Sequence, residues 1–111
     1  MSGDDDDRIY HLALLADWTA AAAAGEYTIS TLGRTLAEEG FIHASRSDQW
    51  RGVKERFYAG VTDPLVLLVI DPQRLEVPVL TETVPGTDET FPHIYGPINL
   101  DAVIGVEPAT E

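Results

Sequence analysis

A continuous apolar run from Leu65 to Ile70 places the strongest constraint on the fold of this chain. The run follows Pro64, ends at Asp71-Pro72 and contains only Leu, Val and Ile. A strand with no polar residue on either face has to be covered on both sides. We therefore expect residues 65–70 to form a central strand with other elements packed on its two faces.

A first helix is predicted between Asp17 and Gly25. Asp17 is a suitable N-cap residue for a helix that begins at Trp18, and the five alanines at 20–24 favour helical structure. Gly25 is placed to end the helix, because glycine readily adopts the left-handed conformation that is common just after one. The small side chains would let this helix pack closely against a neighbour.

A second helix is predicted over residues 47–58, with Ser47 as its cap. Trp50, Val53 and Phe57 recur at helical spacing and form one apolar stripe. This pattern is typical of a helix that packs on a core through one face. We expect all three side chains of the stripe to contact the core.

Short strands account for most of the remaining chain. Alternating or apolar segments predict strands at residues 8–13, 40–45, 65–70, 77–82, 93–98 and 102–107. Pro78 cannot donate to a sheet ladder, so its strand is expected at an edge or a bulge. We expect the last two strands to pair through a turn at 99–101, and residues 26–39 to be irregular apart from one helical turn at 35–39. Because the helices come early and most strands late, the sequence predicts an α+β fold.

Composition limits the classes of function. The chain has 111 residues, the size of one domain, and we assign residues 8–107 to that domain and residues 1–7 to a disordered acidic tail. The formal net charge of -12 argues against nucleic-acid binding, which requires clustered Lys and Arg. The sequence has no cysteine, no apolar run long enough to span a membrane and no signal-peptide pattern, so we expect a cytoplasmic protein.

Three histidines are the residues best suited to carry chemistry. His11, His43 and His93 each lie in or beside an apolar segment, and strand alternation puts Ser45 on the face of His43 and Tyr95 on the face of His93. A neutral imidazole offers one donor and one acceptor, and it can serve as acid, base or ligand. We therefore predict a pocket shared by at least two histidines. The alternative for each one is hydrogen bonding to buried backbone groups.

Glu82 is the carboxylate expected at this pocket, where it could orient a histidine or stabilise positive charge on a ligand. The alternative for Glu82 is a solvated position at a strand end. The three histidines could instead bind a catalytic zinc ion, although no two of them have a local ligand spacing. Ser45 could act as a nucleophile beside a histidine, cap the following helix, or lie near a bound phosphate.

Several segments together resemble one bacterial family. They are residues 9–11, 17–27, 40–45, 56–58, 65–71 and 91–97. Over residues 8–106 the sequence resembles domain-of-unknown-function family 952, and the motifs at 40–45 and 91–97 are the specific ones. That family is grouped by resemblance with the ADP-ribosyltransferase-like fold, a split pair of small antiparallel sheets that hold a nicotinamide dinucleotide.

The resemblance implies roles for the polar residues of the predicted pocket. His11 would contact a ribose, and His43 and Ser45 would lie at the second position of the site. Either Glu82 or His93 would act at the reacting sugar, as the group that polarises it or as a base.

The resemblance also adds two ligand-binding residues and a ligand class. Tyr95 would stack on the ligand, and Gly96 is expected beside it. The expectation is a split antiparallel sheet with two main helices that binds a nucleotide or an NAD-derived small molecule and supports ADP-ribosyl transfer or glycosidic chemistry. Because a fold alone does not confer activity, a non-catalytic binding module and a three-histidine metal-dependent hydrolase stay open as alternatives.

Overall fold

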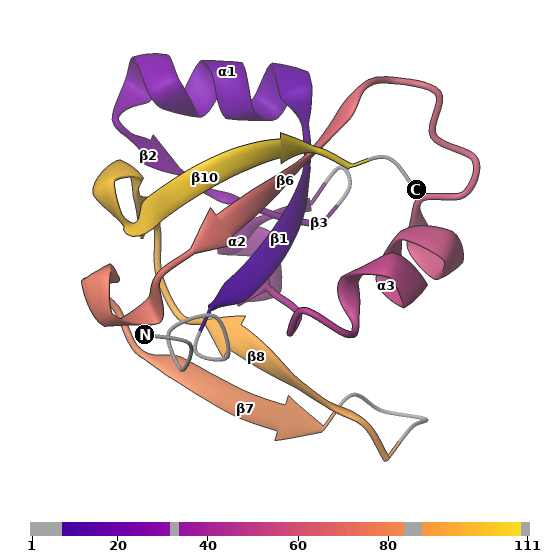
Figure 1. Cartoon of the computed structure of the whole chain (residues 1–111). Coiled ribbons are helices and arrows are strands. Elements are labelled where there is room, and N and C mark those ends of the chain that lie inside the picture. The colour runs from indigo at the N-terminus through magenta and orange to yellow at the C-terminus, as the bar shows by residue number, and fades with distance from the viewer. Residues whose placement is uncertain (1–7, 32–33, 84–87, 110–111) are drawn as a thin grey trace.

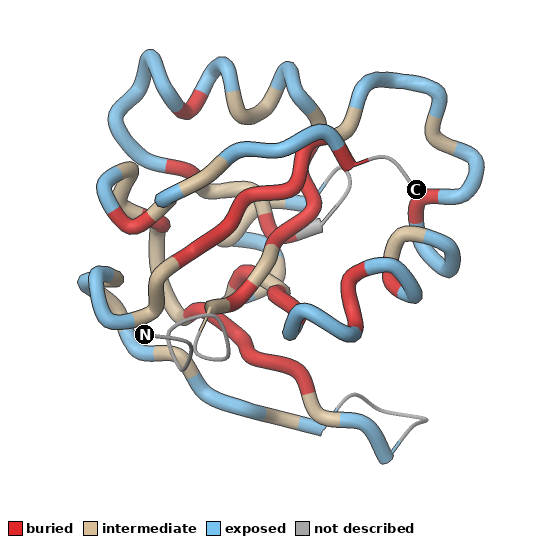
Figure 2. The backbone as a smooth tube through the Cα atoms, in the orientation of Figure 1, coloured by how far each residue is buried: buried red, intermediate tan, exposed pale blue. Residues whose placement is uncertain are grey.

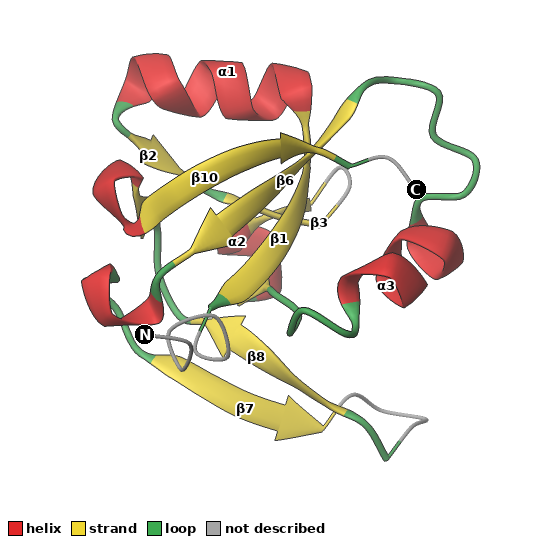
Figure 3. Ribbon diagram, in the orientation of Figure 1, coloured by secondary structure: helices red, strands yellow, loops and turns green. Residues whose placement is uncertain are grey.

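The computed structural model describes residues 8–31, 34–83 and 88–109, so the tail predicted at residues 1–7 lies outside the described residues. Helices and strands follow one another in the order shown in Figures 1 and 3. They are β1 (Ile9–Leu14), α1 (Leu15–Ala24), β2 (Glu26–Tyr27), β3 (Ile29–Thr31), β4 (Arg34–Thr35), α2 (Leu36–Glu39), β5 (Ile42–His43), α3 (Trp50–Phe57), β6 (Leu65–Ile70), β7 (Val79–Thr83), β8 (Thr90–Ile94), β9 (Ile98–Asn99) and β10 (Val103–Pro108). Two short 3₁₀ turns, Pro72–Arg74 and Leu100–Ala102, precede β7 and β10.

The apolar run forms β6, the central strand of an antiparallel sheet ordered β1-β6-β10. One face of β6, including Leu68 and Ile70, packs in a core cluster with Ala21 of α1. Leu67 on its other face packs in a second cluster with Trp50 of α3. Every residue of β6 after Leu65 is buried, and Figure 2 shows this strand as mostly red. The prediction of a central strand covered on both faces is confirmed.

The first helix begins earlier than the sequence predicted. It starts at Leu15 rather than Trp18, and Asp17 lies in its first turn instead of capping it. The N–H of Leu15 donates to the carbonyl of Pro64 at 2.9 Å, so a neighbouring segment satisfies one of the free N–H groups at this helix end. The predicted end is confirmed, since Gly25 has a φ of 97° and its N–H donates to Ala21.

The second helix is shorter than predicted, and the prediction that all three residues of its apolar stripe contact the core is wrong for one of them. α3 begins at Trp50, and Ser47 does not cap it. Trp50 and Val53 are buried as expected, but the Phe57 side chain is 58% exposed, and Tyr58 is buried in its place at 5%. The helix ends at Phe57, so the turn of the chain after it directs the next aromatic ring into the core.

A second antiparallel sheet is ordered β5-β8-β7, with β7 at its edge as Pro78 predicted. The predicted pairing of the last two strands is wrong. β8 pairs with β5 and β7, whereas β10 pairs with β6. The chain between them forms β9 and the 3₁₀ turn at Leu100–Ala102 rather than a hairpin. β10 instead covers the free edge of the apolar strand β6.

The segment at 26–39 was predicted to be irregular apart from one helical turn, but it also contains the short strands β2, β3 and β4. β2 pairs with β9, β3 pairs with β4, and α2 is a single turn capped reciprocally by Thr35 and Glu38. The described residues form antiparallel sheets and three α-helices, so the fold is α+β. In the described part of the chain, no helix has the length and apolar character needed to cross a membrane.

Candidate functional site

One face of the β5-β8-β7 sheet collects most of the predicted site residues. His43 lies directly opposite His93 across β5 and β8, while β7 places Leu80 opposite His93 and Glu82 opposite Phe91. Directly opposed side chains lie on the same side of a sheet, and so do residues two apart on one strand. We call this side of the β5-β8-β7 sheet the histidine face. Its polar and aromatic members are Phe41, His43, Glu82, Phe91, His93 and Tyr95.

Glu82 links two of these residues through a single carboxylate oxygen. Its Oε1 atom accepts a hydrogen bond from Nδ1 of His93 at 2.7 Å and another from the Tyr95 hydroxyl at 2.5 Å. Both hydrogen bonds lower the pKa of Glu82, and the bond from Tyr95 has the larger effect. The bond between Tyr95 and Glu82 also raises the pKa of the Tyr95 hydroxyl. Because a carboxylate can only accept, His93 carries its proton on Nδ1, and in the neutral ring Nε2 is the acceptor.

Both histidines of the pair have a ring nitrogen that lacks a partner. Nε2 of His43 and Nε2 of His93 are buried, and neither forms a hydrogen bond with the described residues. The two ring centroids lie 5.5 Å apart with the planes inclined at 46°. Burial, reinforced by the neighbouring His93 and His11, lowers the pKa of His43 to about 4. Unpaired buried polar atoms are rare in folded proteins and mark places where a ligand could supply the missing partner.

Aromatic rings hold the two imidazoles in place. The ring of Phe41 stacks on His93 with centroids 4.1 Å apart and contacts Tyr95 at 5.5 Å. Phe91 contacts His43 at 5.0 Å. This frame fixes the orientation of His43 and His93, so their free nitrogens are presented in a defined geometry.

His11 lies in the interior and is not part of this face. Its Nδ1 donates to the carbonyl of His43 at 2.6 Å, and its Nε2 accepts from the Tyr27 hydroxyl at 3.1 Å. The side chain is 3% exposed, and burial lowers its pKa to about 4 against the opposing effect of the His43 and Ile29 carbonyls. We infer that His11 ties β5 to β1 and takes the alternative role of a hydrogen-bonded core histidine.

This placement bears directly on the three-histidine metal site. Both ring nitrogens of His11 are engaged within the protein, so no lone pair is left for a metal ion. Across the described residues, no group of three or more His, Asp or Glu side chains could hold a metal ion. The geometry therefore does not assemble the metal centre of a three-histidine hydrolase.

Ser45 and Gly96 have structural environments of their own. Ser45 is buried and forms an isolated β-bridge with Tyr10, in which each backbone N–H donates to the other carbonyl at 2.7 Å. At Gly96, an added Cβ would overlap the Val77 side chain, so close packing requires glycine there. Both residues thus shape the backbone around the histidine face.

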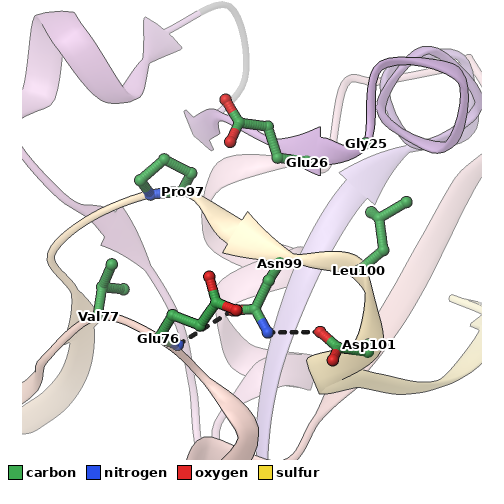
Figure 4. A pocket seen from close by; sticks show the side chains of 8 residues that line it. All are labelled: Gly25, Glu26, Glu76, Val77, Pro97, Asn99, Leu100 and Asp101. Carbon is green, nitrogen blue, oxygen red and sulfur yellow. Dashed lines mark hydrogen bonds between the residues drawn. The ribbon is translucent and has the colours of Figure 1, made fainter.

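A pocket of about 410 Å³ lies apart from the histidines (Figure 4). Its lining residues are Gly25, Glu26, Glu76, Val77, Pro97, Asn99, Leu100 and Asp101. The Asn99 side chain organises one wall, because Oδ1 accepts from the Glu76 N–H and Nδ2 donates to Asp101. Sequence reasoning missed this pocket, since its residues come from three distant segments without a shared motif.

Sequence reasoning also missed two aromatic members of the site. Phe41 was assigned to the strand of His43 without a role, and Tyr27 was not connected to His11. Strand alternation was the available signal for Phe41, because it lies two residues before His43. No sequence signal pairs Tyr27 with His11, since that contact depends on the tertiary arrangement of β1 and β2.

Comparisons with known proteins agree on the fold and name no activity. Residues 12–106 match the profile of the family described as Protein of unknown function (DUF952). The crystal structure of protein CC0527 from Caulobacter crescentus is similar, with 29% identity, a TM-score of 0.77 and coverage of 91% of this chain and 84% of that one. The solution NMR structure of CC0527 gives 27% identity, a TM-score of 0.69 and coverage of 92% and 84%. No curated protein matches the sequence.

Proposed function

Since the chain belongs to the DUF952 family of proteins of unknown function, we propose a function from the geometry of its own site. The protein binds a small hydroxylated molecule of the nucleotide or NAD-derived class on the histidine face. One observation carries the proposal: the buried Nε2 atoms of His43 and His93 have no hydrogen-bond partner among the described residues. A ligand hydroxyl would supply the missing partner to both imidazoles, because a hydroxyl donates one hydrogen bond and accepts others.

The chemistry available to such a complex is general acid–base catalysis at His93. In hydrolysis the bound hydroxyl would be that of a water molecule: its oxygen attacks the anomeric carbon, the glycosidic bond breaks with its electron pair leaving on the base, and Nε2 of His93 accepts the water proton. Glu82 would stabilise the imidazolium through its bond to Nδ1. Tyr95 holds the same carboxylate oxygen and so keeps it aimed at the ring. His43 would bind the other side of the hydroxyl and act as a positioning group.

The ligand class rests on the resemblance to ADP-ribosyltransferase-like proteins, which is part of the proposal. Two separate three-stranded antiparallel sheets, β1-β6-β10 and β5-β8-β7, support it. We assign to His43 the ribose contact that was expected of His11, because both ring nitrogens of His11 already form hydrogen bonds within the protein. With a net charge of -12, neutral ribose and base groups would supply the main contacts rather than phosphates.

A ligand screen by thermal shift tests the proposal. NAD, ADP-ribose and adenosine are added at millimolar concentration to the intact chain and to the Glu82→Gln variant. At least one compound is expected to raise the melting temperature of the wild type, with a smaller shift for Glu82→Gln. Leu80→Ala is the matched control, since Leu80 is exposed on the same face and carries no polar group.

The outcomes separate the candidate functions. Binding with hydrolysis of the glycosidic bond supports an acid–base role for His93, whereas binding without turnover assigns a non-catalytic binding module. No shift with any compound would overturn the ligand class.

A further inference from the structure

The histidine pair has a second property, independent of any organic ligand. His43 and His93 are directly opposed on neighbouring antiparallel strands, and each has a buried Nε2 without a partner among the described residues. We propose that these two nitrogens bind one divalent transition-metal ion, with Glu82 as the carboxylate that orients His93. The site has two protein ligands, so water would complete the coordination and the ion would be exchangeable.

The spacing of the rings fits this geometry. With metal–nitrogen bonds of about 2 Å, two imidazoles bound to one ion have centroids roughly 5 to 6 Å apart. The observed centroid separation between His43 and His93 is 5.5 Å, which lies within this range. The stacked Phe41 ring and the contact from Phe91 already hold both imidazoles near this arrangement.

The hydrogen bond between Glu82 and His93 has the form found around metal-bound histidines. A ligating histidine generally donates its other ring N–H to a carboxylate, which fixes the tautomer and raises the basicity of the ligating nitrogen. Here Nδ1 of His93 donates to Glu82 at 2.7 Å, which leaves the lone pair on Nε2. Imidazole nitrogens favour Zn²⁺, Ni²⁺ and Cu²⁺ over Mg²⁺ and Ca²⁺, so the first group is the expected class.

This metal site goes beyond the proposed function, and a bound ion would inhibit binding of the organic ligand. The ion would occupy the nitrogens assigned above to a ligand hydroxyl, so metal and organic ligand would compete. The two proposals can fail separately, because metal binding is measured without any nucleotide and ligand binding is measured in a chelating buffer.

Calorimetric titration of the untagged chain with Zn²⁺ and Ni²⁺, in excess Mg²⁺, tests the proposal. One equivalent is expected to bind, and His43→Asn and His93→Asn are each expected to lose that binding. Glu82→Gln is expected to weaken it by about 10- to 100-fold, the usual effect of losing a carboxylate that orients a ligating histidine. Because Glu82 is partly exposed, this variant keeps the test valid if a histidine variant does not fold.

Two controls exclude other sources of binding. Leu80→Ala is expected to bind like the wild type, and so is a variant in which Asp4, Asp5, Asp6 and Asp7 are all changed to Asn. Circular dichroism of each variant establishes that it is folded. The proposal is overturned if the wild type binds no ion, if a folded histidine variant binds as tightly as the wild type, or if the aspartate variant alone loses binding.

Discussion

Acidification is expected to destabilise this fold because His11 and His43 are buried in the uncharged form. Burial is the main cause that lowers the pKa of each ring from 6.5 to about 4. The unfolded chain therefore takes up protons at a pH where the folded chain does not. The stability contributed by each neutral ring is present above pH 6.5 and is lost as the pH falls towards 4.

The size of the loss follows from the two shifts. Each ring loses about 2 kcal/mol of unfolding free energy between roughly pH 7 and roughly pH 5, so the pair loses about 4 kcal/mol. A loss of that size is a large part of the total stability of a small domain, about 5 to 15 kcal/mol. Glu82 adds little to the loss of stability between roughly pH 7 and roughly pH 5. Because its pKa is lowered from the ordinary carboxyl value of 4.5, the stability that it contributes is lost only at a pH below that value.

Urea unfolding followed by tryptophan fluorescence over this pH range measures the loss. The His43→Asn variant is expected to show about half the wild-type pH dependence, because only His11 then contributes. Histidine ring shifts measured by NMR provide an independent check, since His11 should not titrate until the pH is near 4. A flat stability profile, or a His11 ring that titrates near 6.5 in the folded protein, would show that burial does not hold these rings in the neutral form.

Three substitutions test the packing around the site. Tyr27→Phe removes the hydroxyl that donates to His11 and should cost about 1 to 3 kcal/mol in urea unfolding, because a buried acceptor is left unpaired; an unchanged midpoint would contradict that bond. Gly96→Ala forces a Cβ against Val77 and should cost about 1 to 3 kcal/mol, with partial recovery in a Val77→Ala background. Absence of recovery would mean that another contact causes the loss. Phe57→Ser should change stability by less than about 0.5 kcal/mol, since this ring is exposed; a larger loss in thermal unfolding would mean that Phe57 packs on the core.

Local patterns were enough to predict the central strand and the order of most elements. The run at Leu65–Ile70 predicted cover on both faces, and this is confirmed. Pro78 predicted an edge strand or a bulge, and β7, which follows it, lies at an edge. Strand pairing was less predictable. The pairing of β10 with β6 depends on which edge of the apolar strand stays open after β1 has paired, and that is a property of the whole fold.

The candidate site was predicted in part, for a similar reason. Alternation along single strands correctly grouped His93 with Tyr95, and both now share Glu82 through hydrogen bonds. It could not separate His11 from the other histidines, because both ring nitrogens of His11 form hydrogen bonds within the protein and strand alternation does not predict those partners. That difference depends on the packing of Tyr27 and the His43 carbonyl around its ring.

The proposed binding mode requires that the free nitrogens of His43 and His93 contact a ligand while His11 does not. Titration of ¹⁵N-histidine-labelled protein with ADP-ribose in a chelating buffer measures this for each ring. The Nε2 resonances of His43 and His93 are expected to shift together and saturate, while both His11 nitrogens stay unchanged. If the His11 resonances move and those of His43 and His93 do not, the histidine face is not the site.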